Sequence, residues 1–213
     1  MFKDNKIKAM LRIIFCLLML IMGGCTTGGK QTEPQLASSY QDNAILIRAV
    51  ASKDLNLYDH KKHTLKFSVV QVEKLEDVQN KIVTAEGISQ LLDADTEADN
   101  LTQTNKKVHI QTFFIAPGMT QTFTIARMAE TKKVLVVAGY YNLTAAGVVR
   151  IYEVPVFNKW NPLTFWKKTR QMGRLGIYLE FGSRAINYTE SSTKASIITK
   201  TRNRVSLKKY WDK

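Results

Sequence analysis

Two places in the 213-residue sequence hold residues whose types and spacing could do chemistry. The thiol of Cys25 follows an apolar run and two glycines, where it could be acylated. His60 and His63 could contact one metal ion if their loop curled. The two lysines between these histidines oppose a cation, and no cysteine or carboxylate lies between them. The sequence therefore disfavours a metal site in this loop.

Local motifs of catalysis are absent from the sequence. Neither Gly-x-Ser-x-Gly, nor His-Glu-x-x-His, nor a glycine-rich phosphate loop occurs. The carboxylates between Asp93 and Asp99 lack the spacing of a calcium-binding EF-hand loop. A catalytic triad assembled from distant residues would leave no such motif. On these motifs we expect no enzyme activity, no cofactor and no small-molecule substrate.

The N-terminus has the pattern of a bacterial lipoprotein signal. Four basic residues precede an apolar run of ten residues, Ile13–Met22, which is too short to span a bilayer. Met22-Gly23-Gly24-Cys25 resembles the lipobox, in which the cysteine is acylated and cleavage leaves it as the first residue. We therefore predict a signal peptide over residues 1–24, the alternative being an ordinary signal peptide with an incidental cysteine. Cys16 would be removed with the signal, which leaves no pair for a disulfide.

A polar stretch of small residues follows Cys25 and predicts a flexible tether over residues 25–43. Thr26 stands where aspartate would retain a lipoprotein in the inner membrane of enteric bacteria. We therefore expect a protein that is lipid-anchored to the outer membrane and faces the periplasm.

Positive charge is concentrated near the C-terminus. The whole sequence has 31 basic and 18 acidic residues, whereas residues 158–213 alone have 13 basic and 3 acidic residues. Such a surface attracts nucleic acid, anionic lipid or an acidic protein, and a lipoprotein signal argues against nucleic acid. We predict a basic extension over residues 190–213 that contacts lipid headgroups or a partner, the alternative being a solvated surface. Its basic residues are Lys200, Arg202, Arg204, Lys208 and Lys209.

Alternating apolar residues predict β-strands through most of residues 44–189. Val134–Ala138 is apolar at every position, which suits a central strand. Thr84–Ala94 breaks the pattern with apolar residues at helical spacing and a threonine cap, and it predicts a short helix. The fold class expected is all-β with a small helical insertion, arranged as a two-sheet β-sandwich.

The order of these features resembles the TssJ family, the outer-membrane lipoproteins of the type VI secretion membrane complex. The matching segments behind the lipobox and tether are Asp54-Leu55-Asn56, Leu65–Val72, Ile88–Leu92, Pro117-Gly118, Val136–Tyr141 and Trp160. Residues 57–64 lack the proline and glycine often found there in the family, and the sequence after Tyr188 does not align with it.

The resemblance implies a transthyretin-like sandwich without catalysis or cofactor. It also implies that the protein anchors the secretion complex by binding the periplasmic domain of the inner-membrane protein TssM. The family's contact loop maps onto Leu57, Tyr58, Asp59, His60, Lys61, Lys62, His63 and Thr64. Independently, a tyrosine beside lysines and histidines has a composition enriched at interfaces, although an ordinary hairpin loop would look the same.

Two other functions fit the sequence. One is a lipoprotein scaffold of another envelope machine, of the pilus or conjugation type. The other is a ligand-binding lipoprotein or a cell-wall hydrolase. Co-purification with a large inner-membrane protein would support either scaffold, whereas peptidoglycan turnover would identify a hydrolase.

Overall fold

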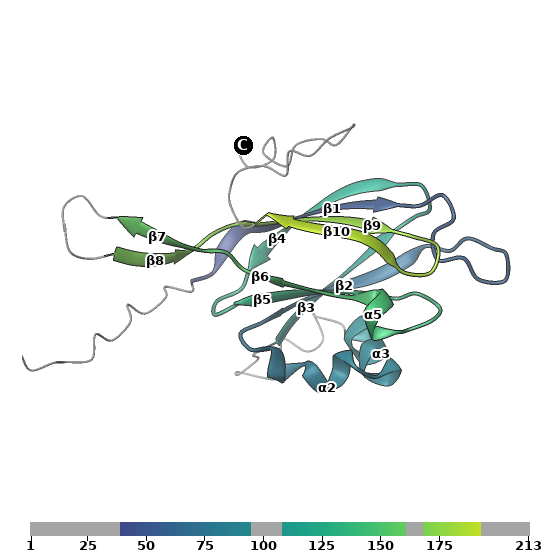
Figure 1. Cartoon of the computed structure of the whole chain (residues 1–213), viewed down its shortest axis with the longest axis horizontal. Helices are drawn as coiled ribbons and strands as arrows, with labels where there is room; N and C mark the ends of the chain where they lie inside the picture. The colour runs from purple at the N-terminus through teal and green to yellow at the C-terminus, as the bar shows by residue number, and fades with distance from the viewer. Residues whose placement is uncertain (1–38, 95–107, 161–167, 193–213) are drawn as a thin grey trace, which may run out of the picture. The chain divides into compact units, whose positions relative to one another are not determined.

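The computed structural model describes residues 39–94, 108–160 and 168–192, which all belong to one compact unit, Leu36–Lys213. Two four-stranded sheets face each other in this unit (Figure 1). The first has the order β10-β9-β1-β4 and the second the order β3-β2-β5-β6. β1 and β9 are parallel, while the other neighbouring strands are antiparallel. A separate two-stranded sheet consists of β7 and β8.

The strand bounds follow the apolar segments of the sequence. The first sheet contains β1 (Gln41–Ala51), β4 (Thr120–Arg127), β9 (Leu175–Phe181) and β10 (Ile186–Ser192). The second contains β2 (Leu65–Val72), β3 (Val108–Ile115), β5 (Lys133–Ala138) and β6 (Val149–Glu153). The remaining pair is β7 (Val156–Trp160) and β8 (Lys168–Met172). The short helical segments are η1 (Leu75–Asp77), α2 (Gln79–Ile82), α3 (Ala85–Asp93) and α5 (Ala145–Val148).

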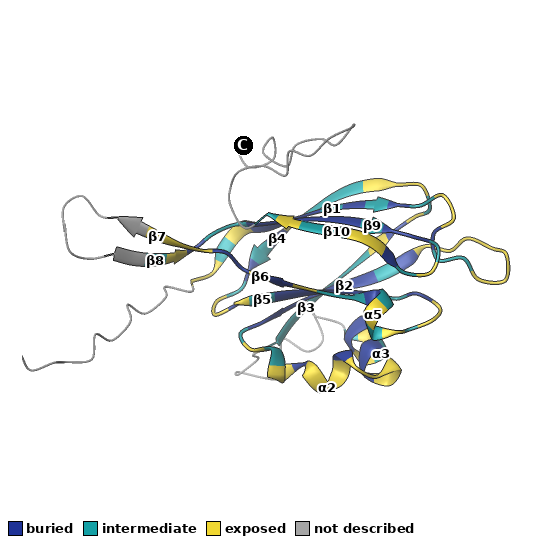
Figure 2. Ribbon diagram, viewed as in Figure 1, coloured by how far each residue is buried: buried dark blue, intermediate teal, exposed yellow. Residues whose placement is uncertain are grey.

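The core lies between the two large sheets and is centred on aromatic rings. Phe67 of β2 lies 5.2 to 5.5 Å, centroid to centroid, from the rings of Phe113, Phe123 and Phe181. These four rings join strands of both sheets, and Phe67 and Phe181 are almost fully buried. Most residues of their strands, β2 and β9, are buried (Figure 2). Burying such rings removes large apolar areas from water, which is the main force that holds a sandwich together.

The helical insertion explains why β5 is apolar on both faces. Ile88, Leu91 and Leu92 of α3 are buried and belong to the same apolar cluster as β2 and β5. α2 and α3 lie against the face of the second sheet that points away from the first sheet (Figure 1). β2 and β5 are therefore covered from both sides, which explains the continuous apolar run of β5, whereas β2 also contains the polar residues Lys66, Ser68 and Gln71.

The predicted helix is confirmed, and so is its cap. Thr84 Oγ1 accepts a hydrogen bond of 3.1 Å from the Gly87 amide, and Glu86 lies in the first turn, where the helix dipole favours a carboxylate. Gly87 packs so tightly on the Lys81 backbone that a Cβ atom would collide with it. The glycine therefore allows α3 to approach α2 closely.

The predicted fold class, an all-β sandwich with a small helical insertion, is confirmed. β1 begins at Gln41, three residues before the predicted start of the sandwich, and β10 continues to Ser192, three residues beyond its predicted end. The extra residues of β1 form because Gln41 pairs with Arg127 across an irregularity in the strand. The signal segment and most of the polar loop expected over residues 93–107 lie outside the described residues, so the proposed division of the chain stays a prediction.

The sandwich has two ends, which are named here by the segments that reach them. At the tether end, β1 and β9 begin, β4 ends, and β10 ends with Ser192 opposite Gly176. At the loop end, β1 and β9 end, and the connections to β2 and β10 begin there. The tether end lies on the left and the loop end on the right of Figure 1.

Candidate functional site

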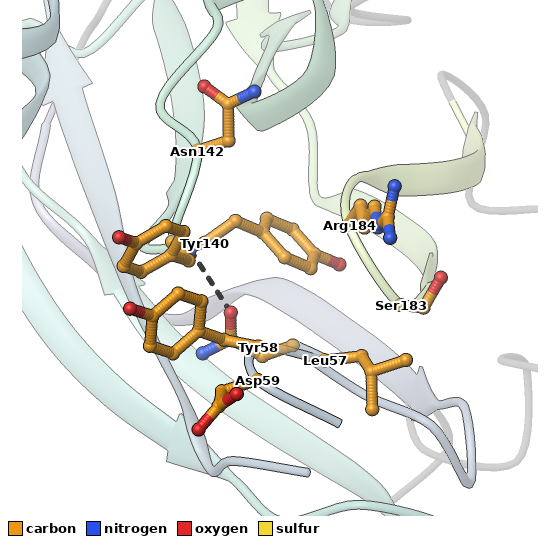
Figure 3. A pocket seen from close by; sticks show the side chains of 9 residues that line it. Leu57, Tyr58, Asp59, Tyr140, Asn142, Ser183 and Arg184 are labelled. Atoms are coloured by element: carbon orange, nitrogen blue, oxygen red, sulfur yellow. Dashed lines mark hydrogen bonds between the residues drawn. The ribbon is translucent and has the colours of Figure 1, made fainter. Parts of the chain in front are cut away.

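Three loops meet at the loop end of the sandwich. They are residues 52–64 between β1 and β2, residues 139–144 between β5 and α5, and residues 182–185 between β9 and β10. Together they enclose an open hollow of about 350 Å³ (Figure 3). Its lining consists of Asn56, Leu57, Tyr58, Asp59, Tyr140, Tyr141, Asn142, Ser183 and Arg184.

A tight turn forms the tip of the first loop. Tyr58 and Lys61 exchange two backbone hydrogen bonds, of 3.0 and 2.8 Å. Asp59 and His60 between them have φ angles of 46° and 57°, which is the backbone of a type I′ hairpin turn. Asparagine and glycine are the residues that favour this conformation, so His60 in particular holds it at a conformational cost. The tight turn keeps Tyr58 at a fixed place on the surface.

The base of this loop is fastened to the core and to the third loop. The Leu55 side chain is fully buried, and the Leu57 amide donates a 2.8 Å hydrogen bond to the Ser183 carbonyl. His63 Nδ1 lies 3.2 Å from the Asn56 carbonyl oxygen. Because a carbonyl oxygen only accepts, this contact requires a proton on Nδ1. The loop is therefore anchored on both sides of its exposed tip.

An aromatic stack joins the first loop to the second. The rings of Tyr58 and Tyr141 lie 3.6 Å apart, centroid to centroid, with an interplanar angle of 21°. Asn56 Oδ1 accepts a 3.1 Å hydrogen bond from the Tyr141 amide, the dashed line in Figure 3. The side-chain hydrogen bond to Tyr58 is the main cause that raises the pKa of Tyr141. The two rings are 45% and 68% exposed, so the stack is an accessible aromatic surface.

Tyr140 fixes the position of the second loop from inside. Its side chain is buried, and its hydroxyl donates a 2.8 Å hydrogen bond to the Ala185 carbonyl in the third loop. Burial raises the pKa of Tyr140 well above the ordinary value, because the phenolate would lose its hydration. Consecutive tyrosines therefore have opposite roles: Tyr140 links two loops internally, and Tyr141 presents its ring to solvent.

The loops of the site also contain charged side chains. Lys62 Nζ lies 3.1 Å from Asp54 Oδ1, and both side chains are more than half exposed, so this ion pair adds little stability. Asp59 and Arg184 lie on the rim of the hollow (Figure 3). An aromatic centre with a charged rim is suited to binding a protein segment.

Among the described residues, no three His, Cys, Asp or Glu side chains gather closely enough to hold a metal ion. The helices of this part of the chain are all too short or too polar to cross a membrane.

The structure brings together only part of the predicted contact loop. Leu57, Tyr58 and Asp59 line the hollow, whereas His60, Lys61, Lys62 and His63 lie on the same loop outside that lining. Cys25 lies outside the described residues. The predicted basic residues Lys200, Arg202, Arg204, Lys208 and Lys209 do as well.

Sequence reasoning missed the other two loops as parts of the site. Tyr141 carried one usable signal, since it is an aromatic residue that follows the apolar strand β5 and precedes a polar turn. Asn142, Ser183 and Arg184 carried none, because their proximity to Tyr58 arises only from the way the sheets bring the loops together.

No protein-family model matches the chain, and no curated protein matches its sequence. Its structure is similar to that of the type VI secretion lipoprotein TssJ1 from Pseudomonas aeruginosa, with 17% identity and a TM-score of 0.42 over 73% of this chain and 97% of that one. A chain of a type VI membrane complex matches with 10% identity and a TM-score of 0.45, over 69% of this chain and 98% of that one. The C-terminal domain of the type VI secretion protein TssM from EAEC matches with 10% identity and a TM-score of 0.41, over 67% of this chain and 94% of that one. These likenesses concern the fold and assign neither a site nor a partner.

Proposed function

We propose that this protein is an outer-membrane lipoprotein, acylated at Cys25, and a non-catalytic component of a type VI secretion membrane complex. In this proposal the loop end binds the periplasmic domain of a TssM-like inner-membrane partner. The lipobox and the order of motifs in the sequence support the class of protein. The accessible stack of Tyr58 on Tyr141 is the observation that carries the binding role.

The stack has the properties of an interface anchor. Tyrosine buries much area on binding and loses little side-chain entropy, and a ring already held in place loses less still. Here Asn56 bonds the Tyr141 backbone, the tight turn bonds the Tyr58 backbone, and the two rings stack on each other before any partner arrives. The stack of Tyr58 on Tyr141 is therefore preorganised to bind an apolar or aromatic segment of a partner.

The position of the stack fits attachment at the opposite end. β1 has 11 residues, so the sandwich separates its ends by about 35 Å. Acyl chains on Cys25 would hold the tether end near the outer membrane. The loop end would then face the periplasm, from which the domain of an inner-membrane partner approaches.

Site-specific photo-crosslinking in the native envelope tests this function. A photoreactive residue at Tyr58 is expected to form an adduct with a large inner-membrane protein of the TssM type. The matched control is Tyr40, another exposed tyrosine, which lies at the tether end. Adducts that are absent at Tyr58, or equally abundant at both positions, would contradict the proposal.

The hollow favours a second candidate, a ligand-binding lipoprotein. Its volume of about 350 Å³ is at the low end of small-molecule pockets, and Asn142 and Arg184 supply polar groups. Such a protein would retain a small molecule through purification, and its crosslinks at Tyr58 would include no inner-membrane protein. A scaffold of a pilus or conjugation machine would instead give a crosslinked partner of another type.

A further inference from the structure

The β7–β8 hairpin stands apart from both sheets of the sandwich. Its two five-residue strands pair only with each other, and the hairpin projects beyond the tether end in Figure 1. An isolated two-stranded ribbon is only marginally stable in water, so a hairpin of this kind gains from contact with another surface. Val156 and Phe157 are 39% and 36% exposed, and they give the hairpin apolar side chains in contact with solvent.

A single guanidinium joins the base of the hairpin to the beginning of the described chain. Arg127 is only 2% exposed. It donates a 2.9 Å hydrogen bond to the Gly173 carbonyl after β8 and a 3.3 Å hydrogen bond to the Ser39 carbonyl before β1. Met172 at the end of β8 is buried in the core, which also holds the base. The hairpin therefore starts beside the point where the N-terminal segment reaches the sandwich.

The number of residues between Cys25 and Ser39 limits how far this end can lie from an acylated Cys25. Ser39 is 14 residues from Cys25, which corresponds to a root-mean-square span of about 21 Å for a flexible chain and a contour of about 48 Å. Each five-residue strand is about 17 Å long. The span of the chain between Cys25 and Ser39 is therefore similar to the length of the hairpin. With acyl chains on Cys25, a hairpin of this length could reach the membrane from its base.

The chemistry of the two strands matches an anionic membrane surface. The described residues 155–160 and 168–174 include four basic residues and no acidic residue, and the sequence between them adds no acidic residue. In the strand register, Asn158 is opposite Arg170, and Trp160 is opposite Lys168. Aromatic residues with lysine and arginine are the combination that favours the headgroup region of an anionic bilayer.

We propose that the β7–β8 hairpin is a second membrane contact, which lies on the anionic lipid headgroups of the membrane that holds the Cys25 acyl chains. Val156, which shares a face of the hairpin with Asn158 and Arg170, contacts the apolar side of the headgroup region, and the basic residues of the strands contact lipid phosphates. This inference rests on the acylation at Cys25 in the proposed function. The hairpin would orient the sandwich so that the loop end points away from the membrane.

Fluorescence quenching on the acylated protein tests the contact. Removal of the signal and acylation of Cys25 leave no free thiol in the mature chain, so one new cysteine can carry an environment-sensitive fluorophore. Asn158→Cys, which leaves Phe157 intact, places the fluorophore on the hairpin, and Asp59→Cys places it at the loop end as the control. The probes are vesicles of phosphatidylcholine with and without phosphatidylglycerol, each containing a lipid-borne nitroxide quencher.

We expect several-fold stronger quenching at position 158 than at position 59, with a further increase when phosphatidylglycerol is present. The charge variant Lys159→Glu/Lys168→Glu should lose that increase while an unchanged circular dichroism spectrum shows that it is folded. Flotation of the protein with the vesicles reports the acyl anchor separately, so a failed anchor is distinguishable from a failed hairpin contact. Equal quenching at positions 158 and 59, in protein that floats with the vesicles, would overturn the inference. A fluorophore at position 158 that is not quenched by the lipid and changes its emission only when a protein partner is added would also overturn it.

Discussion

The stack of Tyr58 on Tyr141 leads to a quantitative prediction about the stability of the loop end. Because the rings contact at 3.6 Å but remain 45% and 68% exposed, truncating either one leaves no cavity in the core. Aromatic pairs contribute about 0.5 to 1.5 kcal/mol beyond the area they bury. A double-mutant cycle of Tyr58→Ala and Tyr141→Ala should therefore give a coupling free energy of unfolding in that range, at the upper part if Asn56 holds the geometry rigidly.

Urea unfolding of the wild type, both single variants and the double variant measures this coupling. Tyr58→Ala with Tyr40→Ala is the matched control, because these tyrosines lie at opposite ends of the sandwich and their effects should add within about 0.3 to 0.5 kcal/mol. A coupling between Tyr58 and Tyr141 no larger than that of the control pair would refute the stacked, preorganised site.

Three further perturbations have defined expected outcomes. His60→Gly should raise the unfolding free energy by about 0.5 to 1 kcal/mol in urea titrations. Glycine removes the left-handed strain at φ 57°, and this gain is reduced because glycine also makes the unfolded chain more flexible. A decrease would contradict the type I′ turn. Gln71→Leu should lower the unfolding free energy by about 2 to 5 kcal/mol in the same assay. The buried Gln71 side-chain amide forms hydrogen bonds of 2.9 Å with the Ala126 carbonyl and of 2.9 Å with the Met128 amide, and the substitution leaves both without that partner. An equally stable variant would exclude this network. Burial raises the pKa of Tyr152 to about 12 from 10.0, so the neutral Tyr152 contributes its full stability below pH 10. The free energy of unfolding should then fall by roughly 3 kcal/mol between pH 10 and about 12. Tyr152→Phe should flatten that part of the stability-versus-pH curve, and an unchanged slope would show that Tyr152 does not cause the fall.

The fold could be predicted from the sequence wherever a periodic pattern of apolar residues matches a buried face. β9 alternates cleanly because one of its faces packs in the core, and β5 is continuously apolar because α3 and the first sheet cover it from both sides. Thr84 predicted the start of the helix because an N-cap is a local interaction between residues three positions apart. Such signals survive in a single sequence because each depends on neighbours along the chain.

The β7–β8 hairpin and most of the site were not accessible in this way. The two hairpin strands pair only with each other and belong to neither large sheet, so they do not need the alternation of a strand that covers the core. Tyr58 meets Tyr141 across 83 positions, and Ser183 is more distant still. Their meeting depends on the order of strands in two sheets, which local patterns do not specify. The parallel pairing of β1 with β9 belongs to the same class of long-range information.

The most direct test of the account is co-purification of the acylated protein from the native envelope, followed by mass spectrometry. The wild type and the Tyr40→Ala control should both retain a TssM-like inner-membrane protein. Tyr58→Ala/Tyr141→Ala should lose most of it, because truncating an exposed aromatic anchor costs roughly 1 to 4 kcal/mol of binding. Full retention of that protein by the double variant, or its absence from the wild type, would contradict the central claim that the loop end binds the secretion partner.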